Sequence, residues 1–140
     1  MIVAPKHPWF ATSTERMVVM HFSRMPTNDE VRDVAASIAA FLEKKPEPRP
    51  WIVEMSDLEE ISASQRKILA DNEDRVASMS KKHVMRLAYV VSKPFARAAL
   101  TAYFWILRPP YPHRVFAERK PAEAWLLGDN LDLGASSRHA

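Results

Sequence analysis

The sequence predicts an α/β domain with a mixed, mostly parallel sheet of about five strands and helices packed on it. Short apolar segments typical of strands alternate along the chain with longer segments of helical periodicity. A strand–helix–strand order of this length favours parallel pairing through a crossover. The chain has 140 residues, 47% of them hydrophobic and 26% charged, which suffices for one domain with one core. The expected order is β-β-α-β-α-β-α-β-α.

The N-terminal part supplies two candidate strands and one helix. Trp9–Thr14 is the weaker strand candidate, whereas "RMVVMHFS" (16–23) is rich in residues that favour strands. Thr27 followed by Glu30 forms the pattern of a capping box, which marks a helix N-terminus. An amphipathic helix is expected from there, because apolar residues recur at helical spacing at Val31, Val34, Ile38, Phe41 and Leu42.

The central part predicts strand, helix, strand. "WIVEM" (51–55) follows the stiff connector "PEPRP" and is short and apolar. A second helix is expected over 64–79, with Gln65 and Glu73 among the polar residues on its outer face or flanks. "MRLAYVVS" (85–92) is continuously apolar between its ends, which is typical of a strand buried on both faces.

The third predicted helix, Phe95–Leu107, is the unusual one. Pro94 stands at its first turn, where proline is well tolerated. Apolar residues point in nearly every direction around it, and Arg97 and Thr101 are among its few polar positions. A helix on a sheet normally keeps a polar outer face. The sequence therefore predicts more apolar surface here than one side of a sheet can cover.

The remaining segments complete the domain. "PHRVFAE" (112–118) predicts a last strand, and the segment from Pro121 onward predicts a short closing helix. The expected boundaries are an N-terminal arm or edge strand over 1–15, the domain over 16–127, and a flexible tail over 128–140.

Composition excludes several kinds of site. Cysteine is absent, so disulfides, thiol catalysis and metal–thiolate sites are excluded. No histidine pair has metal-ligand spacing, and no phosphate-binding glycine loop or nucleophile elbow occurs, so we expect no metal, no cofactor and no catalytic residue. The sequence lacks a secretory signal pattern and an apolar run long enough to cross a bilayer, so a cytoplasmic location is expected.

The charges are unevenly distributed. Residues 1–80 carry 10 Lys and Arg against 13 Asp and Glu, a net −3, whereas residues 81–140 carry 10 against 4, a net +6. This asymmetry could steer an acidic partner, a nucleic acid or an anionic headgroup toward the second part, or it could be ordinary solvated charge. Nucleic acid is disfavoured, because the basic residues are spread without the glycine–aromatic strand motifs of RNA-binding sheets.

Two segments carry a resemblance to a known family. The element order, the stretch "WIVEMSDLEEISASQRKIL" (51–69) and the phrase "VSKPFARAALTAYFWILRPPYPHRVFAERKPAEAWLL" (91–127) resemble the STAS domains of anti-sigma-factor antagonists and the wider SpoIIAA-like group. The resemblance covers about 16–127. It implies a bacterial domain of this fold that regulates through protein–protein interaction, in a branch without an assigned function.

The same resemblance suggests a switch loop. In STAS switches an aspartate and then a serine stand at the start of a helix, after a strand and a turn, and the serine is phosphorylated. Aligning 51–64 with that pattern puts Ser62 at the aspartate position and Ala63 at the position of the phosphorylated serine. Asp57, Ser62 and Ser64 are the candidates, since a slip of one residue puts Ser64 at the helix N-terminus. The alternative is that Ser62 or Ser64 simply caps the helix.

The third helix gives the main functional hypothesis, an interaction surface for a protein partner or a second copy of the chain. Its candidate residues are Leu100, Tyr103, Phe104, Trp105, Leu107 and Arg108. The alternative is a helix buried on both sides, for instance beneath the N-terminal arm around Trp9 and Phe10.

A second hypothesis is a carrier or sensor with an apolar pocket between this helix and the sheet. An acyl or other apolar ligand would then place an anionic headgroup against the candidates Arg97, Arg108, His113 and Arg114. Catalysis by a carboxylate pair, Glu54 with Asp57, is disfavoured, because neither a nucleophile nor a metal accompanies it, and helix capping or solvated charge explains both residues equally well.

Overall fold

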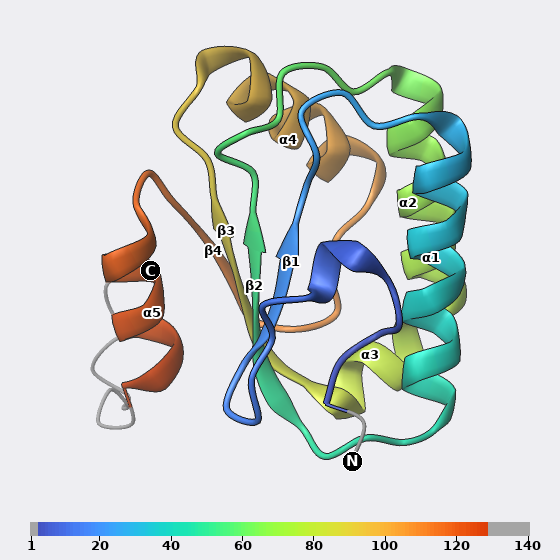
Figure 1. Ribbon diagram of the computed structural model, residues 1–140, viewed down its shortest axis with the longest axis vertical. Coiled ribbons are helices and arrows are strands. Elements are labelled where there is room, and N and C mark those ends of the chain that lie inside the picture. Colours follow the sequence, from blue (N-terminus) through green and yellow to red (C-terminus); the bar gives the residue numbers. More distant parts are fainter. Residues whose placement is uncertain (1–2, 129–140) are drawn as a thin grey trace.

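A computed structural model of the chain describes residues 3–128, so most of the predicted tail lies outside the described residues. Its centre is a sheet of four strands in the order β1-β2-β3-β4 (Figure 1). The strands are β1 (Val18–His21), β2 (Arg49–Glu54), β3 (Val84–Val90) and β4 (His113–Phe116). Each neighbouring pair is parallel. The predicted α/β class and alternating order are confirmed.

The helices form two unequal layers on this sheet. Four helices cover one face, and a fifth stands alone on the other, at the left of Figure 1. They are α1 (Asn28–Glu43), α2 (Ala63–Arg75), α3 (Ala77–His83), α4 (Pro94–Ile106) and α5 (Arg119–Leu127). Each parallel strand pair is joined by a crossover on the same face, as the right-handed rule requires for this strand order.

Strand alternation divides the interior into two cores. Met20, Val53 and Tyr89 face the layer of α1 to α4, whereas Val19 and Val90 face α5. The first core is the larger and contains most of the buried aromatic residues. The sheet is therefore buried on both faces, as its continuously apolar strands predict.

The N-terminal arm differs from the prediction. Pro8–Phe10 forms a short 3-10 helix, η1, where an edge strand was expected, so the described sheet has four strands instead of about five and is parallel throughout. Pro8 starts this turn, and the His7 side chain accepts a hydrogen bond from the backbone N–H of Trp9. Trp9 and Phe10 are buried in the larger core, which explains their apolar character without a strand.

The helix ends follow local capping chemistry. Thr27 and Glu30 form the predicted capping box at the start of α1. The predicted helix over 64–79 is two helices, because α2 ends at Arg75 and α3 begins at Ala77. The turn at Val76 between them directs Ser80 into the interior, where it is 1% exposed.

Among residues 3–128, none of the helices combines the length and the hydrophobicity that a membrane crossing requires.

Candidate functional site

Helix α4 exposes a stripe of apolar side chains to solvent. Trp105 is 81% exposed, Ile106 57% and Phe95 48%. With 3.6 residues per turn, these residues fall on one side of the helix together with Ala98 and Ala102. We call these five residues the α4 patch. Its large side chains are among the most exposed apolar groups of the described residues.

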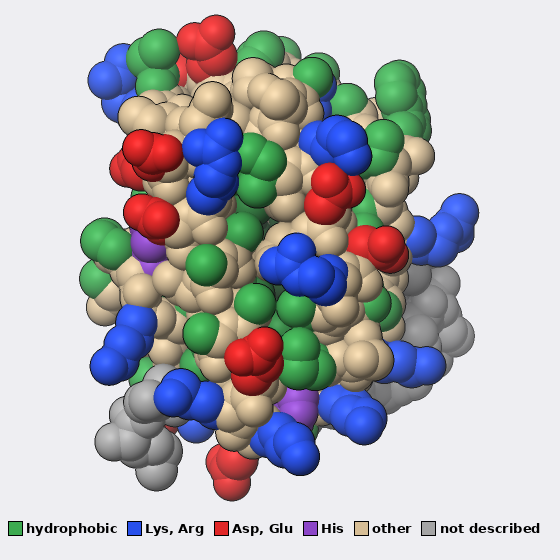
Figure 2. Space-filling view, turned by 90° about the vertical axis from the view of Figure 1, so that its right-hand side faces the viewer, with side chains coloured by type: hydrophobic (Ala, Val, Ile, Leu, Met, Phe, Trp, Pro, Cys, Tyr) green, Lys and Arg blue, Asp and Glu red, His purple; other side chains and the backbone are tan. Residues whose placement is uncertain are grey.

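The flanks of the α4 patch are basic. Lys93, Arg97 and Arg108 are all exposed beside it. From Arg75 to Ala117 the chain carries eight Lys and Arg residues and no Asp or Glu. The face formed by α1 and α2 is different, because Figure 2 shows basic and acidic side chains interspersed over it. The region around α4 therefore combines apolar surface with charge of one sign.

The structure divides the predicted interaction residues between the two sides of α4. Trp105 and Arg108 are exposed, whereas Leu100 and Leu107 are buried. Tyr103 and Phe104 are partly buried against the larger core. Sequence reasoning also left Phe95 and Ile106 out of the predicted surface, although their helical spacing from Trp105 could have placed them there.

The N-terminal arm packs away from the α4 patch. The Trp9 ring lies 4.9 Å from the Phe22 ring, and the Phe10 ring lies 5.9 Å from the Trp51 ring. Both contacts belong to the β1–β2 side of the larger core, and η1 contacts β1. The arm thus fills the first half of the helical layer and leaves the outer side of α4 in solvent.

A cavity of about 90 Å³ lies between the sheet and the helices, beneath the inner side of α4. Its walls are mostly apolar and include Met20, Phe22, Met55, Leu69 and Leu100. Ala99, Leu100 and Tyr103 are the residues that α4 contributes. The cavity lies where the sequence predicted an apolar pocket. That it binds a ligand stays a hypothesis.

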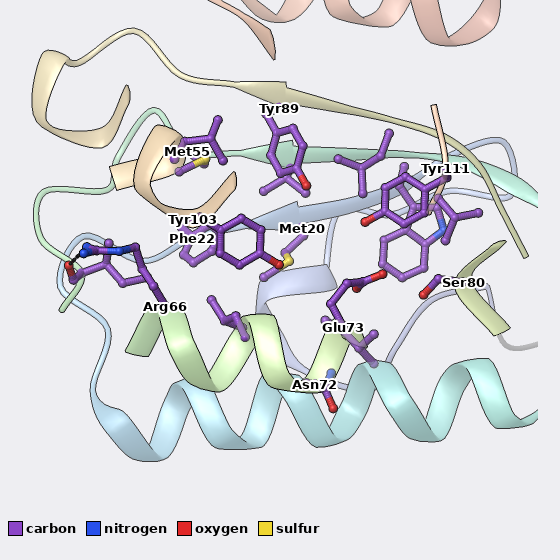
Figure 3. Close-up of a pocket in the computed structure, with 18 of the residues that line it drawn as sticks. Met20, Phe22, Met55, Arg66, Asn72, Glu73, Ser80, Tyr89, Tyr103 and Tyr111 are labelled. Atoms are coloured by element: carbon purple, nitrogen blue, oxygen red, sulfur yellow. Dashed lines mark hydrogen bonds between the residues drawn. The ribbon is translucent and has the colours of Figure 1, made fainter. Parts of the chain in front are cut away.

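One end of the cavity is polar. Figure 3 shows the hydroxyl groups of Tyr89, Tyr103 and Tyr111 directed into the cavity, with Glu73 extending from α2 toward Tyr111. Ser80 lies at the same end, and Arg66 lies at the other. Sequence reasoning placed Glu73 on the outside of its helix, and the structure corrects this. The signal that could have found it is the spacing of Arg66, Leu69 and Glu73, which places all three on one side of α2.

The predicted anion-binding residues do not converge. His113 and Arg114 point to opposite faces of the sheet, because they are neighbours on β4. Arg114 lies over the rings of Phe116 and Trp125 on the α5 side, and Arg97 donates to the carbonyl oxygen of Val91 at 3.0 Å. None of the four predicted residues is among those described as lining the cavity.

The predicted switch loop is held by local hydrogen bonds. Ser62 is the N-cap of α2: its hydroxyl accepts from the backbone N–H of Gln65, and the Gln65 side chain accepts from the backbone N–H of Ser62. The Ser64 hydroxyl is exposed, 3.2 Å from that of Ser62. Asp57 is exposed. Phosphorylation of either serine stays a hypothesis, and the observed role of Ser62 is capping.

The loop also carries an exposed ion pair. The Arg24 guanidinium donates to both carboxylate oxygens of Glu59, at 3.0 Å each. The hydrogen bond and the charge of Arg24 lower the pKa of Glu59. This pair ties the loop after β2 to the loop after β1, where such loops meet at one edge of a parallel sheet.

The carboxylate pair considered for catalysis is separated. Glu54 is buried, accepts a short hydrogen bond from Ser56 and lies 3.6 Å from Arg119 of α5, whereas Asp57 is exposed. Glu54 thus connects β2 to α5. Within residues 3–128, no group of three or more His, Asp or Glu side chains is arranged to hold a metal ion.

Comparison with known proteins assigns the chain to a family. Residues 27–128 match a family described as a domain of unknown function (DUF7793). The chain belongs to this family. The matched region spans α1 to α5 and therefore includes both the α4 patch and the cavity. None of the curated proteins searched matches the chain.

Two solved structures have the same fold. A protein of the DUF3478 family with a SpoIIAA-like fold, from Shewanella loihica PV-4, has a TM-score of 0.54 and 14% identity, over 79% of this chain and 83% of that one. An anti-sigma-factor antagonist (STAS) domain protein from Planctomyces limnophilus has a TM-score of 0.53 and 15% identity, over 91% and 98%. These similarities confirm the STAS/SpoIIAA-like fold that the sequence resemblance implied.

Proposed function

We propose that the protein is a non-catalytic regulatory or scaffolding domain that binds a partner protein through the α4 patch. The observation that carries this proposal is the exposure of Trp105, Ile106 and Phe95 on one side of α4. Contiguous apolar surface on a folded domain marks an interaction site more often than unused surface. Tryptophan and arginine are also the residues that most often dominate binding energy at interfaces.

The charges around the α4 patch favour an acidic partner over a second copy of the chain. Lys93, Arg97 and Arg108 flank the patch, and the chain has no acidic residue from Arg75 to Ala117. Two copies that met symmetrically through this surface would bring like charges together. We therefore infer that the partner presents an apolar anchor surrounded by Asp or Glu side chains.

The test compares one apolar-to-acidic change on the patch with a matched change elsewhere. Partners of the wild type would first be identified by photo-crosslinking in cells of the native host and then purified. In titrations with a purified partner, Trp105→Glu should abolish binding. Met85→Glu is the control, because Met85 is also apolar and 55% exposed but lies on β3. Reversing the charge at Arg97 and Arg108 should weaken the same binding and reduce its dependence on salt.

Two outcomes would contradict the proposal. Equal recovery of partners by the wild type and Trp105→Glu would show that α4 is not the interface. Sedimentation could instead detect concentration-dependent dimers of the wild type. If Trp105→Glu loses these dimers and Met85→Glu keeps them, the α4 patch binds a second copy of the chain.

A further inference from the structure

The polar end of the cavity contains a carboxylate without a full set of partners. Glu73 Oε2 is buried and has no hydrogen-bond partner among the described residues. Glu73 takes part in none of the ion pairs among residues 3–128. Their acidic members are Asp29, Glu54, Glu59, Asp71 and Glu123. A buried carboxylate that lacks an ion-pair partner is unfavourable in its charged form unless protonation, hydrogen bonds or a cation compensates it. A cation from outside the chain could supply that compensation.

The groups that face Glu73 are uncharged. They are Ser80 of α3, Tyr89 of β3, Tyr103 of α4 and Tyr111 of the segment after α4. Burial, together with the nearby charge of Glu73, raises the pKa of all three tyrosines, so their hydroxyl groups stay protonated at neutral pH. Burial also raises the pKa of Glu73 itself, and hydrogen bonds that the hydroxyls of Ser80 and Tyr111 donate to its carboxylate oppose that shift.

The three tyrosines suit an organic cation. Their rings come from different elements and meet in one cavity with the carboxylate (Figure 3). Their hydroxyl groups, which are directed into the cavity, present oxygen atoms that can accept hydrogen bonds from an ammonium group. A carboxylate among such groups adds charge pairing.

Among residues 3–128, Arg66 is the basic residue that lines the cavity, and it does not lie at this end. Arg66 lines the other end of the cavity, two turns of α2 from Glu73, or about 10 Å along the helix axis. Its guanidinium donates to the carbonyl oxygen of Ile61 at 3.1 Å. The space between these two residues is lined mainly by apolar side chains.

We propose that the cavity binds a small organic amine, whose ammonium group pairs with Glu73 between the three tyrosines and whose apolar part lies along α2 toward Arg66. The volume of about 90 Å³ is smaller than the roughly 150 Å³ cavity that holds one benzene ring, so it suits a short alkyl amine and excludes an aromatic ligand or a phospholipid. This ligand site is separate from the α4 patch, although α4 contributes residues to both.

The test uses three probes of similar shape with the full-length protein. Isothermal titration calorimetry would compare butylamine with the neutral 1-butanol and the anionic butanoate, which are small enough for the cavity. The amine should bind about tenfold or more tightly than the alcohol, since one charge-assisted contact contributes about 1.4 kcal/mol or more. Glu73→Gln should remove this preference and leave alcohol binding unchanged. Asp74→Asn, the same charge change on the neighbouring exposed residue, should leave it intact.

A second measurement does not depend on a variant. Amine affinity of the wild type should fall as the pH is lowered through the raised pKa of Glu73, because protonation removes the paired charge, whereas alcohol affinity should stay constant. Equal binding of the three probes, preference for the carboxylate, or no amine binding at millimolar concentration would overturn the proposal.

Discussion

Helices α2 and α4 pack against each other on the same face of the sheet, yet they distribute polar and apolar residues in opposite ways. Helix α2 buries Gln65, Asn72 and most of Glu73, whereas α4 exposes Trp105 and Ile106. An ordinary surface helix does the reverse on both counts. The buried polar residues of α2 thus lie at the cavity (Asn72 and Glu73) or against the start of α1 (Gln65), whereas the exposed apolar residues of α4 form the proposed partner surface.

The inward and outward sides of α4 should respond very differently to truncation. Leu100→Ala removes a side chain that is 5% exposed and should lower the free energy of unfolding by about 3 kcal/mol through lost burial and a new void. Trp105→Ala, at 81% exposed, should change it by less than about 0.5 kcal/mol. Urea unfolding of both variants measures the difference. Similar losses in the two variants would mean that the rings of α4 are packed in solution.

The polar interior of α2 should be costly to remove. The Gln65 side chain donates to the carbonyl oxygen of Pro26 and to Asn28 Oδ1, both at 2.9 Å. Gln65→Leu leaves buried acceptors without a donor and should destabilise the protein by about 2 kcal/mol in urea unfolding. Lys67→Ala, on the exposed side of the same helix, is the control. A neutral effect of Gln65→Leu would show that α2 behaves as an ordinary apolar packing helix.

Glu73 should give the smallest change, in the opposite direction. Its raised pKa means that the folded state binds a proton more readily than the unfolded state, so stability falls as the pH rises from the ordinary value of 4.5 through the raised pKa. Glu73→Gln should therefore stabilise the ligand-free protein at pH 7 by about 1 kcal/mol, and this gain should vanish below pH 4.5. Thermal unfolding between pH 4 and pH 8 measures it. A gain independent of pH would indicate that protonation of Glu73 is not the cause.

Much of the fold was predictable from local patterns. The capping box at Thr27 and the apolar strands around Val53 and Tyr89 are short-range signals, and each element they predict is present. The segment around Trp9 was mistaken for a strand, because burial by packing against Phe22 and Trp51 gives the same composition as burial in a sheet. Only the tertiary arrangement distinguishes these two cases.

The two candidate sites differed in how far the sequence could predict them. Helical spacing predicts that α4 has more apolar surface than one face of a sheet can cover, whereas the structure was needed to distinguish an exposed patch from a helix buried on both sides. The cavity depends on Glu73, Tyr89 and Tyr111, which lie on separate elements and meet only after folding. Spacing places Glu73 on the same side of α2 as Arg66 and Leu69, but it does not indicate which residues of other elements that side meets. Helical periodicity therefore could not predict the polar end of the cavity.

Tyr103 and Trp105 stand two residues apart on α4, one in the wall of the cavity and the other in solvent. A small movement of this helix would therefore change both the proposed ligand site and the proposed partner surface. If the cavity holds its ligand more tightly in one position of α4, a protein bound to the outside must prefer or oppose that position, and the two affinities change by the same factor. One short helix thus provides a physical route by which a metabolite could control an assembly.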